Sequence, residues 1–171
     1  MKFAPAFPTQ FTRAPLLAQL CLGVLAIFIA TLSFRLWSDW RHNPDLSHGL
    51  LMPVVFLLLL HEGRSAGPFR WLKPGVASAT GFGALLLAGL LALVASGLYA
   101  ASLDWSNAVV NFTLTGALVL LLATAVVVLS SETVRLVPFN WSAGVAAALW
   151  LLCAPIPPGT YSRLTLGLQL W

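Results

Sequence analysis

The sequence predicts an all-α, polytopic membrane helical bundle, a single transmembrane domain over 1–171 with about five spans and the start of a sixth. Composition is the first reason, because 59% of the 171 residues are hydrophobic and 8% are charged. A soluble domain of average composition has about 25% charged residues. Arrangement is the second reason, because the apolar residues form long runs between short polar connectors. We therefore expect a lipid bilayer as the main partner of this chain.

The charge pattern argues against nucleic acid as a partner. The net charge is +4, but the nine lysines and arginines are scattered between the apolar runs and form no basic stripe. Such residues set the topology of a membrane protein. The two cysteines, Cys21 and Cys153, have no repeated spacing and no paired histidines, so we expect no metal site and no cofactor.

The first span is predicted near 16–37. Residues 16–34 carry no charge, and at ~1.5 Å per residue this run is long enough to cross a hydrocarbon core of ~30 Å. The apolar part of a cleaved signal peptide has only ~7–15 residues, so we expect an uncleaved anchor. Three prolines before the run favour a short tail over 1–15: Pro5, Pro8 and Pro15.

The second span is predicted near 47–61, after a polar and aromatic segment. Its apolar core over 49–60 is short and contains Pro53, so its length is marginal for a crossing. We expect it to cross the bilayer by including the polar residues at both ends. A segment that dips into the bilayer and returns is the alternative.

Three further spans are predicted near 76–100, 108–129 and 141–154, separated by short polar turns. No charged residue lies between Lys73 and Asp104. Four glycines in this stretch are expected to allow close helix packing: Gly81, Gly83, Gly89 and Gly97.

A proline-rich segment ends the fifth span. Pro155, Pro157 and Pro158 lack backbone donors and restrict φ, which stops a helix. From 164 the sequence is apolar again, as expected for the start of a sixth span, and continues to Trp171. A chain rarely ends inside a helix at membrane depth, so we expect an incomplete copy of a longer domain.

The distribution of basic residues predicts a cytoplasmic N-terminus. With that orientation six basic residues lie inside and three outside, as the positive-inside rule favours. The inside set is Lys2, Arg13, Arg64, Arg70, Lys73 and Arg135, and the outside set is Arg35, Arg41 and Arg163. Two polar, proline-marked segments, 45–53 and 155–163, are then expected on the extracytoplasmic face. Cys21 and Cys153 are expected near opposite faces, too far apart for a disulfide.

His48 is the first candidate for chemistry, because imidazole titrates near neutral pH and can act as an acid, a base or a hydrogen-bond donor. The alternative is an interfacial histidine that caps the next helix or bonds a backbone carbonyl. Ser47 fits a helix N-cap better than a nucleophile, since it lacks the Gly-x-Ser-x-Gly setting. Asp45 can pair with Arg41, although an exposed pair of this kind contributes only ~0–1 kcal/mol.

Arg163 is the second candidate, because its guanidinium can neutralise a carboxylate or a developing oxyanion. An interfacial anchor is the alternative, and Arg35 is expected to snorkel in the same way. Gln169 is polar within a predicted span and is expected to face protein. Cys153 has no neighbouring cation in the sequence that would activate its thiol, so we interpret it as a small buried hydrophobe. Trp150 is expected to pack between helices.

Two landmarks resemble the exosortase/archaeosortase family. The first is Trp40 followed by Asp-Leu-Ser-His-Gly-Leu-Leu-Met-Pro over 45–53 and an apolar span. The second is Pro155-Ile156-Pro157, then Arg163 and a Leu-x-x-x-Leu-Gln run that ends at Gln169. They occur in the family's order with three spans between them, and the resemblance covers nearly the whole chain.

The resemblance implies a membrane cysteine protease/transpeptidase of the bacterial inner membrane. Such enzymes process C-terminal Pro-Glu-Pro sorting signals of exported proteins, so these proteins are the implied substrates. In the family the nucleophilic cysteine and its basic partners follow the Leu-Gln run, whereas Cys153 precedes it. We therefore expect an inactive polypeptide and name no catalytic residue. The residues expected to shape the site are Asp45, Ser47, His48, Gly49, Pro53, Pro155, Pro157, Arg163 and Gln169. The alternative function is a non-enzymatic membrane subunit or scaffold associated with envelope polysaccharide export.

Overall fold

A computed structural model describes residues 15–65, 69–157 and 159–170 of the chain. These residues form helices and no β-strand, apart from one isolated bridge between Leu72 and Ser131. The α-helices are α2 (Leu16–His42), α3 (Met52–Ser65), α4 (Val76–Leu103), α5 (Ala108–Leu129), α6 (Trp141–Leu149) and α7 (Thr160–Gln169), and the 3₁₀ helices are η1 (Pro44–Leu51) and η2 (Trp150–Cys153). Residues 1–14 of the tail predicted over 1–15, and also Pro158 and Trp171, lie outside the described residues.

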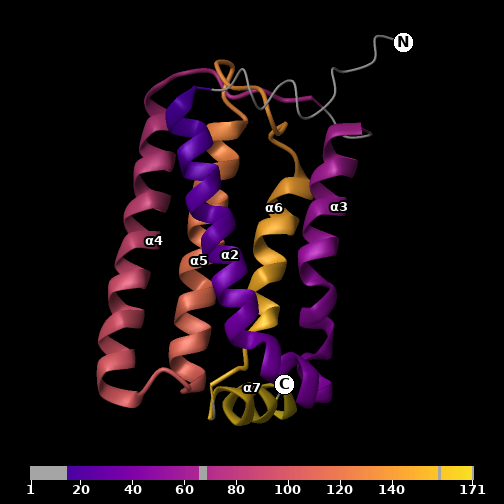
Figure 1. Ribbon diagram of the computed structural model, residues 1–171, viewed down its shortest axis with the longest axis vertical. Helices are drawn as coiled ribbons and strands as arrows, with labels where there is room; N and C mark the ends of the chain where they lie inside the picture. Colours follow the sequence, from indigo (N-terminus) through magenta and orange to yellow (C-terminus); the bar gives the residue numbers. More distant parts are fainter. Residues whose placement is uncertain (1–14, 66–68, 158, 171) are drawn as a thin grey trace.

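Helices α2 to α6 run side by side with alternating direction, and α7 lies across one end of the bundle (Figure 1). We call this end the motif end; it contains 43–51, 104–107 and 153–163. The opposite end, called the far end, contains the loops 69–75 and 130–140.

The all-α membrane bundle predicted from the sequence is confirmed. Four helical segments are long and apolar enough to cross a bilayer: Ala18–His42, Pro44–Ser65, Val76–Leu103 and Ala108–Leu129. Trp141–Cys153 is a shorter apolar helix of nine residues in α6 and four in η2. The chain is therefore a multi-pass membrane protein.

Helix α2 is longer than the sequence predicted, because it continues to His42 instead of ending near 37. Leu32, Leu36 and Trp40 are spaced four residues apart and all three are buried. This spacing places them on one helix face, so the core-facing stripe extends through the polar segment. The helix ends where Asn43 adopts an extended conformation before Pro44, as residues that precede proline prefer.

The second span is continuous, from η1 into α3. Its helices cover Pro44–Ser65, and α3 runs along the bundle to the far end (Figure 1). The Asn43 side chain accepts a hydrogen bond from the Asp45 N–H and caps η1. Pro53 lies in the first turn of α3, where a missing N–H costs little. A segment that dips in and returns is not what the structure shows.

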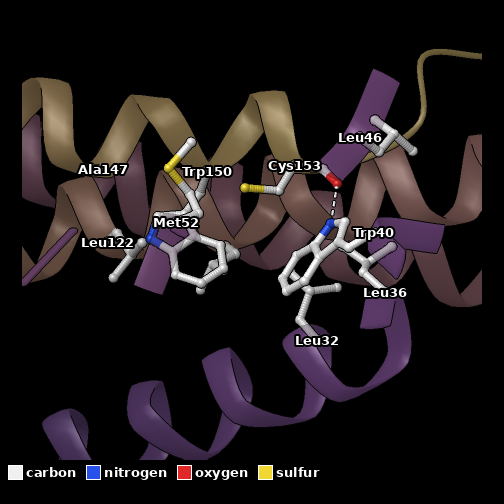
Figure 2. Packing of buried hydrophobic residues seen from close by; sticks show 10 residues of the cluster. Leu32, Leu36, Trp40, Leu46, Met52, Leu122, Ala147, Trp150 and Cys153 are labelled. Atoms are coloured by element: carbon white, nitrogen blue, oxygen red, sulfur yellow. Dashed lines mark hydrogen bonds between the residues drawn. The ribbon is translucent and has the colours of Figure 1, made fainter. Parts of the chain in front are cut away.

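The core lies between α2, α5, α6 and the two 3₁₀ helices. Leu32, Leu36, Trp40, Leu118 and Trp150 are its largest apolar side chains and are fully buried (Figure 2). A second cluster lies between the end of α5, the loop that follows it and the start of α6. The core is therefore off-centre, and the outer face of α4 is left exposed.

Only one of the four α4 glycines has the predicted packing role. A Cβ on Gly89 would lie 2.9 Å from a Leu121 methyl carbon. A Cβ on Gly81, Gly83 or Gly97 would meet no atom within 4 Å. The expectation of close packing is wrong for these three, because no side chain or backbone of another described element lies against them.

The start of a sixth span was predicted at 164. Residues 160–169 form α7, which has ten residues and lies across the motif end (Figure 1). Gly159 has φ 90°, in the left-handed region that favours glycine, and there the chain turns across the motif end (Figure 1).

Candidate functional site

Side chains from α2 and η1 form hydrogen bonds with the end of η2 at the motif end. The last carbonyls of a helix have no partner within the helix. At the end of η2, the Cys153 carbonyl accepts a hydrogen bond of 2.8 Å from Trp40 Nε1 (Figure 2). The Leu152 carbonyl lies 2.9 Å from His48 Nε2. Residues 48 and 152 are 104 positions apart in sequence, so these bonds hold the first motif against the residues directly before the second one.

The His48 contact matches one of the alternatives stated for this residue, a ring that bonds a backbone carbonyl. A carbonyl can only accept, so Nε2 carries the hydrogen in this arrangement. The side chain is exposed, which leaves Nδ1 as an acceptor toward solvent or a ligand. His48 thus links η1 to η2, and its other ring nitrogen has no hydrogen-bond partner among the described residues.

Gly49 lies directly under the Trp40 indole. A Cβ at this position would be 2.3 Å from Trp40 Nε1 and 2.5 Å from Trp40 Cδ1. Real atoms do not approach so closely, so the indole can reach the Cys153 carbonyl only because residue 49 has no side chain. Close approach is therefore the physical reason for this glycine.

Cys153 is a core residue, as predicted. Its side chain is fully buried, and Sγ lies 3.9 Å from the Leu149 carbonyl of the preceding turn. Figure 2 shows the thiol among apolar groups, between Trp40 and Trp150. Trp150 is also packed as predicted, with its ring 6.1 Å from that of Phe56 in an edge-to-face arrangement.

Asp45 and Ser47 are exposed on η1. Ser47 Oγ donates to the Pro44 carbonyl at 2.8 Å, and Asn43, not Ser47, caps the helix. The N-cap interpretation of Ser47 is therefore wrong, because the helical segment begins three residues earlier than predicted. Asp45 forms no ion pair with Arg41, although both are described.

The second landmark contributes its prolines to this site but not its polar side chains. Ala154 is extended, and Pro155 and Pro157 are half-buried beside it. Arg163 and Gln169 are exposed on α7, and neither side chain bonds another described residue. The hydrogen bonds at the motif end therefore link His48 and Trp40 to residues 152 and 153, and none of those among the described residues includes the side chain of Arg163 or Gln169.

Arg35 is a structured residue that the sequence analysis treated as a simple snorkelling cation. Its Nε donates to Asn111 Oδ1 at 2.9 Å, and its Nη2 donates to the Trp105 carbonyl. The guanidinium also lies over the Trp105 ring, 5.1 Å from the centroid. Asn111 is the signal that was missed, because a polar side chain inside a predicted span is expected to have a protein partner.

The turn beside Arg35 holds one carboxylate with a perturbed pKa. The Trp105 N–H donates to Asp104 Oδ1 at 2.7 Å, and the Ser106 hydroxyl donates to Oδ2 at 3.0 Å. Both bonds favour the ionised form, so they lower the pKa of Asp104, with the Trp105 bond as the larger cause.

The motif end presents an imidazole acceptor, a carboxylate and an exposed guanidinium, from His48, Asp45 and Arg163, but no exposed thiol among its described residues. Over the described ranges, no group of three or more His, Cys, Asp or Glu side chains is placed to hold a metal ion. No protein-family model, curated protein or solved structure matches this chain.

Proposed function

We propose that this chain is the N-terminal part of an exosortase-like membrane cysteine protease/transpeptidase and that it receives the C-terminal sorting signals of exported proteins. Under this proposal the chain lies in the bacterial inner membrane with a cytoplasmic N-terminus and an extracytoplasmic motif end. The observation that carries the proposal is the hydrogen bond between His48 and the Leu152 carbonyl. It holds the first landmark against Leu152, three residues before the second landmark begins at Pro155.

The chemistry of the motif end fits a Pro-Glu-Pro signal. Arg163 is exposed on α7 and offers a cation for the glutamate carboxylate. His48 Nδ1 offers an acceptor for a backbone N–H. The exposed apolar faces of the spans suit the hydrophobic helix that follows the tripeptide in such signals.

No catalytic residue is assigned to this chain. The family's nucleophilic cysteine follows the Leu-Gln run, whereas Cys153 precedes it and is fully buried. A thiol inside the core cannot attack a peptide bond of an extended signal without disruption of the Trp40 contact. Under this proposal the chain therefore recognises the sorting signal.

Site-specific photo-cross-linking tests the proposal on the full chain in bacterial membranes. A photoreactive residue replaces Ile156, which is 49% exposed at the motif end, or Trp141, which is 85% exposed at the far end. The partner is an exported reporter with a Pro-Glu-Pro tripeptide, a hydrophobic helix and a basic tail. We expect cross-links from position 156 only, and a loss of at least five-fold when the tripeptide is replaced by alanines.

Two histidine variants make the same experiment specific. His48→Ala should reduce the cross-link from position 156, whereas His61→Ala, an exposed histidine at the far end of α3, should not. Equal yields from positions 156 and 141, or a yield that does not depend on the tripeptide, would contradict the proposal.

The burial of Cys153 favours a second function, a non-enzymatic subunit or scaffold in envelope polysaccharide export. In that case the reporter is not cross-linked at the motif end. Deletion of the gene then lowers exported polysaccharide and leaves the processing of sorting signals unchanged.

A further inference from the structure

An apolar pocket lies at the far end, between the start of α4 and the end of α5. It has a volume of about 270 Å³ and opens to the outside of the bundle. Ligand pockets that enclose a small molecule have volumes of roughly 300 Å³ or more, so this one suits part of a longer ligand. Its apolar wall is formed by Leu72, Pro74, Ala79, Phe82, Val127 and Val128.

The polar groups of the pocket leave one charge available. Ser78 Oγ donates to the carbonyls of Lys73 and Gly75, and Ser131 Oγ is bonded to the Thr133 hydroxyl at 3.0 Å. The Lys73 side chain is exposed at the rim and forms no ion pair with another described residue. A ligand would therefore meet hydrocarbon inside the pocket and an ammonium group at its edge.

The loops around the pocket are basic. The segments 69–75 and 130–140 contain three cations, Arg70, Lys73 and Arg135, and one acid, Glu132. The pocket also lies where two membrane-spanning helices reach the bilayer surface (Figure 1), which is the depth of lipid headgroups. The orientation predicted from the charge count places this end at the cytoplasmic leaflet, where anionic lipids attract basic segments.

We propose that this pocket binds an anionic glycerophospholipid. Part of one acyl chain lies against Phe82, Val127 and Val128, and the phosphate pairs with Lys73. The site is independent of the motif end, so it stands whether or not the chain receives sorting signals.

Lipid affinities measured by native mass spectrometry on the purified full chain test this site. Phosphatidylglycerol should bind about five-fold more tightly than phosphatidylcholine, because the choline cation of phosphatidylcholine cancels the charge of its phosphate and removes a net attraction of ~1 kcal/mol. Lys73→Gln should abolish this difference by weakening phosphatidylglycerol about five-fold. Ala79→Trp, which fills the pocket from an exposed position, should weaken both lipids.

Arg41→Gln is the matched control, because it removes an exposed cation at the motif end. It should leave both affinities unchanged. Three results would overturn the proposal: equal affinity for the two lipids, equal losses in Lys73→Gln and Arg41→Gln, or displacement of phosphatidylglycerol by sn-glycerol 3-phosphate at the same concentration. The last result would assign the site to a free phosphate compound.

Discussion

The two ends of the bundle are held together in different ways. At the far end the two loops pair through their backbones: the Leu72 N–H donates to the Ser130 carbonyl, and the Glu132 N–H donates to the Leu72 carbonyl. At the motif end, the backbone hydrogen bonds of the described residues are all local. There the links between elements are made by side chains, from Arg35, Trp40 and His48.

This difference predicts that the two ends respond differently to substitution of single residues. A backbone pair tolerates many side chains, whereas a bond from an indole or a guanidinium requires that residue type. Two side chains also reach across the far end, from Arg64 to the Leu136 carbonyl and from Asn140 to the Gly63 carbonyl. Even so, the motif end alone depends on side chains for every link between elements, so its geometry should respond most to single substitutions.

Gly49→Ala should have the largest effect. Its Cβ would lie 2.3 Å from Trp40 Nε1, so the indole must move and its bond to the Cys153 carbonyl breaks. Overpacking costs ~1–3 kcal/mol and an unpaired buried carbonyl a further ~1–3 kcal/mol, so we expect a loss of roughly 2–6 kcal/mol in the free energy of unfolding. Thermal or denaturant unfolding in detergent measures it.

Gly97→Ala is the matched control, since it is the same change in a helix where the Cβ would meet no atom within 4 Å. Alanine is the better helix former, so this variant should be neutral or more stable by up to ~1 kcal/mol. Similar losses in both variants would show that the Trp40 contact is not what holds the motif end together.

The contrast between the ends also explains what the sequence could predict. The bounds of α5, Ala108–Leu129, follow from an uncharged apolar run that starts after a polar turn. An uncharged run predicts that a segment lies in lipid. It does not predict which residues of other helices each of its side chains contacts. For that reason the end of α2 and the packing of Gly81, Gly83 and Gly97 were predicted wrongly.

The same limit applies to the candidate site. The order of the motifs was enough to select the segments around His48 and Pro155. Their proximity depends on where η2 ends, because Trp40 and His48 form hydrogen bonds with the last carbonyls of that helix. Arg35 could not be assigned a role without its partner on α5. The membrane orientation and the roles of Arg163 and Gln169 stay predictions.

A smaller effect is expected at the Arg35 link, which joins α2 to α5 and to the turn before it. A double-mutant cycle of Arg35→Lys and Asn111→Ala should give a coupling energy of ~0.6–1.7 kcal/mol, the range of hydrogen bonds between membrane helices. Lysine keeps the charge but cannot make both the Asn111 and the Trp105 bonds. A cycle of Arg41→Lys with Asn111→Ala should give no coupling, and a coupling equal to that of Arg35 would contradict a specific link.

The smallest expected effect is a pH dependence at the turn next to Arg35. Hydrogen bonds from the Trp105 N–H and the Ser106 hydroxyl lower the pKa of Asp104 in the folded state. As the pH falls, Asp104 is therefore protonated in the unfolded state before it is protonated in the folded state. The contribution of this carboxylate to the free energy of unfolding is complete above about pH 4 and is lost as the pH falls further, through the folded-state pKa. Asp104→Asn should flatten that part of the stability profile in acid unfolding experiments, because the amide has nearly the same shape and does not take up a proton in this pH range. Ser106→Ala removes one donor and should give an intermediate slope. If both variants keep the wild-type slope below pH 4, the turn does not contribute to the acid sensitivity of the motif end.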